Sequence, residues 1–208
     1  IHPSDVWKYK DNLELTINKL EKMLVDNIWL VKWIWECWFD FFRIDNSNLE
    51  EEKILQEKFF KAQIKLAMKY SLPIIIHTRN AKEVTLEVLK EMNAKKFVLH
   101  CFSEDLDFAY KAIYYSDECK ISFSWIVTYK SAQNVQNTAA NIPLSRILVE
   151  TDCPFLAPQI VRWTENIPNN TRYILEKVCE LRQNNDKKEN PEEIENQVYK
   201  NSLEFFEI

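Results

Sequence analysis

The sequence predicts an α/β fold in which a parallel β-sheet is covered by helices. Two observations carry this prediction. Short apolar runs alternate along the chain with segments of helical periodicity, and no Asn-Gly or similar hairpin dipeptide joins one run to the next. Strands covered on both faces read as near-continuous apolar runs, which is the pattern of parallel sheets. The 208 residues show no repeat and no domain boundary, so we expect one domain over 1–208.

Five runs are expected as strands because they are rich in β-branched, aromatic and other apolar residues. They cover residues 30–37, 72–77, 96–102, 119–124 and 145–152. Helices are expected over 48–71, 80–92, a segment after Ser103, 130–140, 171–183 and a segment that begins at Pro191.

Residues at the helix starts support these boundaries. Ser47 or Asn48 stands before glutamates that suit a first helical turn, and Asn80 has Glu83 at the spacing of a capping box. Ser103 is a candidate cap for the third helix. The stretch 153–170, rich in Pro and Asn, is expected as a loop.

Composition excludes several classes of protein. A net charge of −5 gives no global basic surface for nucleic acid. Five cysteines without a C-x-x-C pair indicate free thiols in a reducing compartment, so we expect a cytoplasmic location. No apolar stretch reaches transmembrane length, so no membrane association is expected.

Polar side chains follow four of the predicted strands. Glu36, His77, His100 and Asp152 each lie at or next to the end of an apolar run. Sites in parallel α/β folds form at these carboxyl ends, and two histidines with two carboxylates are a mixed ligand set for a divalent metal. Taken singly, each residue also has a structural explanation, as a hydrogen-bonded strand end or a helix cap. The pattern favours metal-hydrolase chemistry and leaves the structural alternative open.

Cysteines directly follow three of these candidate ligands. Because successive strand side chains face opposite sides, we expect Cys37 and Cys101 to point toward the helices as buried apolar groups. They are not expected to be ligands.

Three further residues are candidates for substrate binding. Arg79 lies two residues after His77 and suits a phosphate or carboxylate, with a surface salt bridge as the alternative. Arg162 and Asn166 lie in the loop after Asp152, where contact with substrate and simple solvent exposure are both possible.

The segments that carry these residues resemble a known family. "ECWFDFFR", "LPIIIHTRNA", "VLHCFS", "ISFSWIVTYK", "IPLSRILVETDCPFLAP" and "ENIPN" are similar, in this order, to segments of the TatD-type metal-dependent deoxyribonucleases. The resemblance covers essentially the whole chain. It implies a (β/α) TIM-type barrel that hydrolyses DNA phosphodiester bonds with two divalent metal ions.

The resemblance also implies roles for individual residues. Glu36 matches the glutamate that bridges the metals, and His77 and His100 match the two histidines of one metal position. Asp152 matches the aspartate of the other position, near the attacking water, and His2 matches a histidine near the mouth of the barrel.

The chain departs from the family at its start. The family's first strand carries a His-x-His pair that has no counterpart here. We therefore expect a barrel incomplete at the N-terminus, lacking a first strand–helix–strand portion, with at most one well-ligated metal site. Mg, Mn and Zn are not distinguished.

Tryptophan stands where the family has glycine. The chain has 7 Trp and no Gly, and Trp35, Trp38, Trp125 and Trp163 occupy such positions. Glycine permits unusual backbone angles that a bulky residue opposes. Some bacteria read UGA as glycine and others as tryptophan, so we hypothesise that UGA glycine codons have been read as tryptophan here. A natural Trp-rich variant is the alternative.

Together these features predict an enzyme, a metal-dependent hydrolase that cleaves DNA, with Asp152 and Glu36 as catalytic residues. DNA is the expected substrate, and no obligate protein partner is implied. A related barrel amidohydrolase acting on an amide or ester is one alternative. A truncated barrel that binds without turnover is the other.

Overall fold

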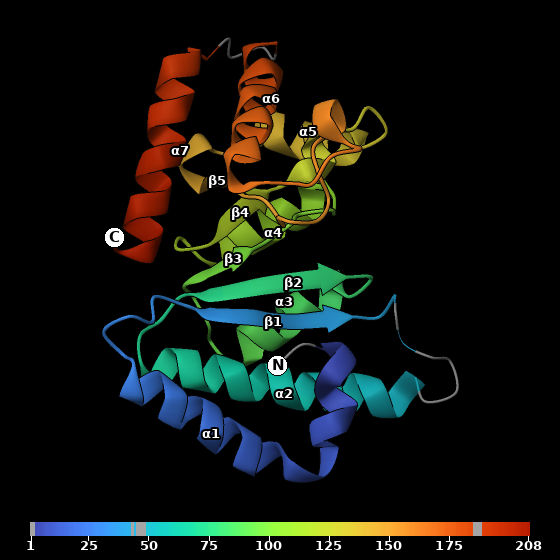
Figure 1. The fold of residues 1–208 in the computed structure, drawn as a ribbon, viewed down its shortest axis with the longest axis vertical. Coiled ribbons are helices and arrows are strands. Elements are labelled where there is room, and N and C mark those ends of the chain that lie inside the picture. Colours follow the sequence, from blue (N-terminus) through green and yellow to red (C-terminus); the bar gives the residue numbers. More distant parts are fainter. Residues whose placement is uncertain (1–2, 43, 45–48, 185–188) are drawn as a thin grey trace. The chain divides into compact units, whose positions relative to one another are not determined.

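The predicted alternation of strands and helices is present in the structure (Figure 1). This computed structural model describes residues 3–42, 44, 49–184 and 189–208. The chain divides into two compact units, residues 1–98 and 99–208, and the boundary falls inside strand β3 (Phe97–Leu99). The single domain expected over 1–208 stays a prediction.

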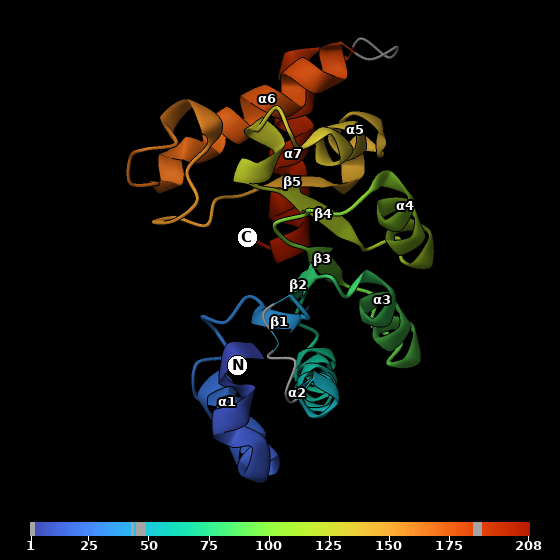
Figure 2. The same cartoon turned by 90° about the vertical axis from the view of Figure 1, so that its right-hand side faces the viewer.

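The first unit is built on two parallel strands, β1 and β2. Its elements are η1 (Pro3–Asn12), α1 (Leu13–Asp26), β1 (Ile34–Asp40), α2 (Leu49–Lys69), β2 (Ile74–Arg79) and α3 (Lys82–Glu91). Helix α2 packs against β1, and α1 packs against α2 (Figures 1 and 2). Ile74 N donates to Lys96 O at 3.1 Å, so the segment leading into β3 lies on the other side of β2.

Strand β1 contains an irregularity at the position of Glu36. Ile34 is paired with Ile74 and Cys37 with Ile76, so β1 uses one residue more than β2 over this stretch. Such a bulge re-aims the side chains next to it. Helix α2 supplies partners for the β1 backbone: Gln63 Nε2 donates to Glu36 O at 3.4 Å, and Gln56 Oε1 accepts from Asp40 N at 3.0 Å.

The second unit continues the same alternation. Its elements after β3 are α4 (Leu106–Tyr115), β4 (Lys120–Phe123), η3 (Trp125–Thr128), α5 (Gln133–Asn141), η4 (Leu144–Arg146), β5 (Ile147–Val149), η5 (Gln159–Val161), η6 (Pro168–Asn170), α6 (Thr171–Gln183) and α7 (Pro191–Phe206). Strands β4 and β5 are parallel, and Phe102 N donates to Ser122 O at 3.0 Å just past β3. Helices α4 to α7 follow one another around β4 and β5, and α6 and α7 both contact β5 (Figure 2).

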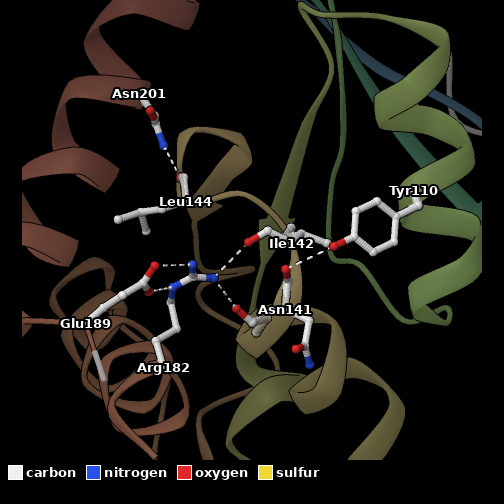
Figure 3. Close-up of polar contacts among 8 residues, drawn as sticks. Tyr110, Asn141, Ile142, Leu144, Arg182, Glu189 and Asn201 are labelled. Atoms are coloured by element: carbon white, nitrogen blue, oxygen red, sulfur yellow. Dashed lines mark hydrogen bonds and ion pairs between the residues drawn. The ribbon is translucent and has the colours of Figure 1, made fainter. Parts of the chain in front are cut away.

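A buried arginine fixes the segment that leads into β5 (Figure 3). Arg182 is 0% exposed, and its Nη1 donates to Ala139 O at 2.9 Å and to Ile142 O at 3.0 Å. The same guanidinium forms an ion pair with Glu189. A guanidinium has only donors, so each buried N–H group of Arg182 needs an acceptor such as these carbonyl and carboxylate oxygens.

Asn201 of α7 acts on the same segment. Its Nδ2 donates to Leu144 O at 2.8 Å and to Ile147 O at 2.9 Å. Together with Arg182, it holds the start of β5 in place, and β5 leads directly to Asp152.

Two predicted helix caps are wrong. Asn80 has φ of 55°, and the cap position of α3 is Ala81. Helix α4 is capped by Asp105, whose side chain accepts from Phe108 N at 2.9 Å, and not by Ser103. Ser47 and Asn48 lie outside the described residues.

Other boundaries agree better with the predictions. The helix expected at Pro191 begins there, and the helix expected over 171–183 has these bounds. Residues 3–26, for which no element was predicted, form η1 and α1. Of the helices in the described part of the chain, none combines the length and the apolar composition that a membrane span needs.

Candidate functional site

Glu36 and His77 are neighbours on the paired strands of the first unit. Both side chains are half-buried, and a carboxylate oxygen of Glu36 lies within 4.8 Å of a ring nitrogen of His77. The strand bulge and the hydrogen bond from Gln63 hold the backbone at Glu36. A carboxylate oxygen and an imidazole nitrogen are ordinary ligands of divalent metals, so this donor pair fits such an ion.

Arg79 extends the same face of β2. Burial alternates along this strand, with Ile74, Ile76 and Thr78 buried and the residues between them half-buried. His77 and Arg79 therefore point to one side of the strand. The Arg79 guanidinium lies 3.8 Å from the centre of the Phe42 ring, which holds it by a cation–π contact.

Cys37 directly follows Glu36 in β1. It is 0% exposed, which confirms the expectation that it is a buried apolar group. Burial raises the pKa of its thiol to about 12. A protonated thiol is a poor metal ligand, so Cys37 is part of the core and not of the site.

His100 begins the polar cluster of the second unit. It follows β3 directly and is buried, and its Nδ1 lies 3.1 Å from Glu150 Oε1. The Cys101 backbone N–H also donates to Glu150. Glu150 was not predicted as a site residue, although it stands two positions before Asp152 at the end of a predicted strand. That position was the signal that could have identified it.

Cys101 faces Asp152, and the expectation that it points toward the helices is wrong. Its Sγ donates to Asp152 Oδ2 at 3.3 Å and lies 3.0 Å from Ser124 Oγ. Burial, followed by the charges of Asp152 and Glu150, raises the pKa of this thiol well above its usual range. The thiol is therefore a hydrogen-bonding group beside Asp152.

Arg162 and Asn166, in the loop after Asp152, differ in their exposure to solvent. Arg162 is exposed, and its guanidinium carbon lies 4.8 Å from the Trp163 ring centre and 5.3 Å from that of Tyr129. Asn166 is only 2% exposed, so the expectation of solvent exposure is wrong for this residue.

Asn166 has an internal role. Its Nδ2 donates to Thr151 Oγ1 at 2.6 Å and to Phe155 O at 2.7 Å, and its Oδ1 accepts from Asn170 at 2.9 Å. The side chain of Asn166 thus links different parts of the loop, and the N–H groups of its amide donate to acceptors within the loop. His2, the remaining candidate, lies outside the described residues.

The tryptophans at the glycine positions differ in burial. Trp35 is 63% exposed and Trp163 is 88% exposed. Trp125 is half-buried against Tyr129, and its buried Nε1 has no hydrogen-bond partner among the residues that the structure describes. A buried donor without a partner is unfavourable. The side chain of Trp38 lies outside the described part of the structure.

Comparison with known proteins places these residues in a family. The family model described as TatD related DNase matches residues 1–207. The chain belongs to this family. This chain is 37% identical over 210 residues to an uncharacterized metal-dependent hydrolase of Buchnera aphidicola, and the match covers 100% of this chain and 72% of that protein.

A second relative is matched over less of its length. The uncharacterized metal-dependent hydrolase YabD of Bacillus subtilis is 37% identical over 133 residues, which is 63% of this chain and 51% of YabD. This chain therefore spans from about half to about three quarters of the length of these relatives.

Solved structures show the fold of this chain. The TatD homologue YjjV of Escherichia coli has a TM-score of 0.84 at 26% identity, with 100% of this chain and 75% of that chain covered. A TatD-family hydrolase of Entamoeba histolytica has a TM-score of 0.80 at 22% identity, with 99% and 72% covered. The predicted α/β fold of the TatD-like TIM barrel is therefore confirmed.

Proposed function

We propose that this chain forms the metal- and phosphate-binding part of a hydrolase that cleaves DNA phosphodiester bonds. The observation that carries the proposal is the Glu36–His77 pair, with Arg79 on the same face of β2 as His77. A pair of metal ligands beside a guanidinium suits a phosphodiester. A bound metal ion and the guanidinium N–H groups can both contact oxygens of the same phosphate. Membership in the TatD-related family supports the same substrate class.

In this proposal, Glu36 and His77 of the first unit are ligands of a divalent ion, and His100 and Asp152 are the ligands that the second unit contributes. Mixed imidazole and carboxylate ligands suit Zn²⁺ and Mn²⁺ and do not separate them from Mg²⁺. A bound ion supplies a Lewis acid that polarises the phosphate and makes an attacking water more acidic. We expect at most one well-ligated ion on this chain.

The protein's own residues then orient the reactants. Asp152 orients the attacking water or accepts its proton, and the Cys101 thiol steadies the carboxylate through its contact with Oδ2. Arg79, held over the Phe42 ring, binds a phosphate oxygen, and the exposed Arg162 meets the DNA backbone. Asn166 supports the loop instead of the substrate, and a substrate role for His2 stays a prediction.

The direct test measures metal binding and nuclease activity on the same samples. The purified chain is freed of metal and titrated with Mn²⁺ and with Zn²⁺ by calorimetry, and cleavage of a fluorescent single-stranded DNA is followed. We expect His77→Gln and Glu36→Gln to lower metal affinity at least ~10-fold. Glu87→Gln, on an exposed position of α3, is the matched control and should bind as the parent does.

The other outcomes separate the alternatives. Hydrolysis of chromogenic esters or amides without DNA cleavage would indicate an amidohydrolase. Metal binding without any turnover would indicate a binding module. Equal metal affinity of the parent and both variants would refute the proposed ligands.

The compartment and the partners are part of the same proposal. All five cysteines are free, which suits a reducing cytoplasm. DNA is the proposed partner, and no protein partner is required by the residues described above.

A further inference from the structure

Glu150 receives two hydrogen bonds from one turn of chain. Its carboxylate accepts from the Cys101 backbone N–H and lies 3.1 Å, at Oε1, from His100 Nδ1. These residues are separated by 49 and 50 positions in the sequence, so the contact is a product of folding and not of local geometry.

The chemistry of the two partners decides which imidazole nitrogen carries the proton. An ionised carboxylate has acceptors only, so the nitrogen that faces it must be the N–H. In a neutral imidazole the other nitrogen then keeps its lone pair. A Glu150 carboxylate at Nδ1 therefore selects the Nδ1–H form of His100 and leaves Nε2 as the basic nitrogen.

We propose that Glu150 is the positioning residue that fixes His100 in the Nδ1–H tautomer, with Nε2 as its metal-binding atom. The tautomer stands on the hydrogen bonds alone, whereas the metal role of Nε2 rests on the proposed function. Metal-binding histidines commonly donate their second ring N–H to a carboxylate in this way.

The backbone around both residues is held firmly enough for this task. Glu150 N donates to Phe123 O at 3.0 Å, which continues the pairing of β5 with β4 by one residue. On the other side, Cys101 has φ of 46°, a left-handed conformation that brings its N–H to Glu150. Glu150 is thus held by the hydrogen bond of its backbone N–H to Phe123 O and by the hydrogen bond that its carboxylate accepts from the Cys101 N–H.

The test reads the tautomer directly in the metal-free protein. Side-chain nitrogen NMR of the ¹⁵N-labelled chain reports which ring nitrogen carries the proton, and three histidines make assignment by His77→Gln and His2→Gln simple. We expect His100 in the parent to be the Nδ1–H tautomer at a pH where the ring is neutral. Finding Nε2–H in the parent would overturn the proposal without any variant.

Variants then test whether Glu150 causes the preference. In Glu150→Ala and Glu150→Leu, which remove the acceptor, His100 should shift to the Nε2–H form or to a mixture, while Glu118→Ala, on an exposed position, should leave it unchanged. Backbone spectra show whether each variant is folded. A folded Glu150 variant that keeps the parental tautomer would also overturn the proposal.

Metal titration separates this inference from the proposed function. If both hold, Glu150→Leu binds Mn²⁺ or Zn²⁺ about 10- to 100-fold more weakly than the parent. If the tautomer changes and metal affinity does not, the positioning of the ring stands and the proposed metal role of His100 fails.

Discussion

Cys37 and Cys101 each follow a candidate metal ligand, yet the structure uses them in opposite ways. Cys37 follows Glu36 within β1, and its side chain is fully buried in the core of the first unit. Cys101 follows His100 beyond the end of β3, and its thiol contacts Asp152 and Ser124 in the second unit. One thiol fills space, and the other belongs to a polar cluster.

The difference shows where strand periodicity stops being informative. Strand β1 pairs regularly with β2 from Cys37 to Asp40, so alternation places Cys37 and Phe39 together on the buried face. Strand β3 ends at Leu99, and the positive φ of Cys101 turns the chain. Alternation predicts side-chain direction only while the strand lasts.

The largest expected effect of the difference between Cys37 and Cys101 is on the pH dependence of stability. Burial raises the pKa of Cys37 from an ordinary value near 9 to about 12, so the folded state holds this proton more tightly than the unfolded state. The stabilisation is complete below the unfolded pKa and is lost as pH rises toward the folded pKa. Between these limits, the Cys37 contribution should fall by about 1.4 kcal/mol for each pH unit.

Urea unfolding at pH 8, 9, 10 and 11 measures this contribution. Other groups titrate in the same range, so the informative quantity is the difference in slope between the parent and Cys37→Ala. Ile64→Val, at a buried position without a titratable group, serves as the control and should keep the parental slope. Identical slopes for all three proteins would contradict the burial argument.

A smaller effect should come from replacing each thiol by a hydroxyl. Cys37→Ser places a polar group in an apolar core and should cost about 1–3 kcal/mol of unfolding free energy. Cys101→Ser should cost less than about 1 kcal/mol, because its hydroxyl can bond with the same Ser124 and Asp152 oxygens. Denaturant midpoints of the two variants check this order, and a reversed order would mean that the two environments have been misassigned.

The smallest effect is expected at Trp35, which directly precedes Glu36 in β1. Its ring is 63% exposed, so Trp35→Gly loses little buried area. We expect a change below about 1 kcal/mol, the ordinary cost of glycine in a strand, compared with about 3–5 kcal/mol for a tryptophan removed from a core.

Thermal unfolding of Trp35→Gly beside its parent measures the difference. Metal titration of the same pair tests whether relief of bulk next to Glu36 also strengthens binding. A stability loss of core size would show that the Trp35 ring belongs to the native packing, against the hypothesis of a glycine position.

Much of this protein follows from its sequence alone. Apolar runs and helical periodicity predicted the α/β class, the strand ends indicated Glu36, His77, His100 and Asp152 as candidate ligands, and alternation predicted the burial of Cys37. These properties are local, because side-chain direction within a regular strand repeats every two residues.

Tertiary structure decided the contacts that cross the chain. The turn at Cys101, the reach of Glu150 to His100, the burial of Asn166 and the binding of Gln63 to the β1 backbone have no local signature. Each depends on which strand ends and helices meet after packing. A buried polar group must then find a partner among the groups that the fold brings near, and sequence spacing does not name that partner.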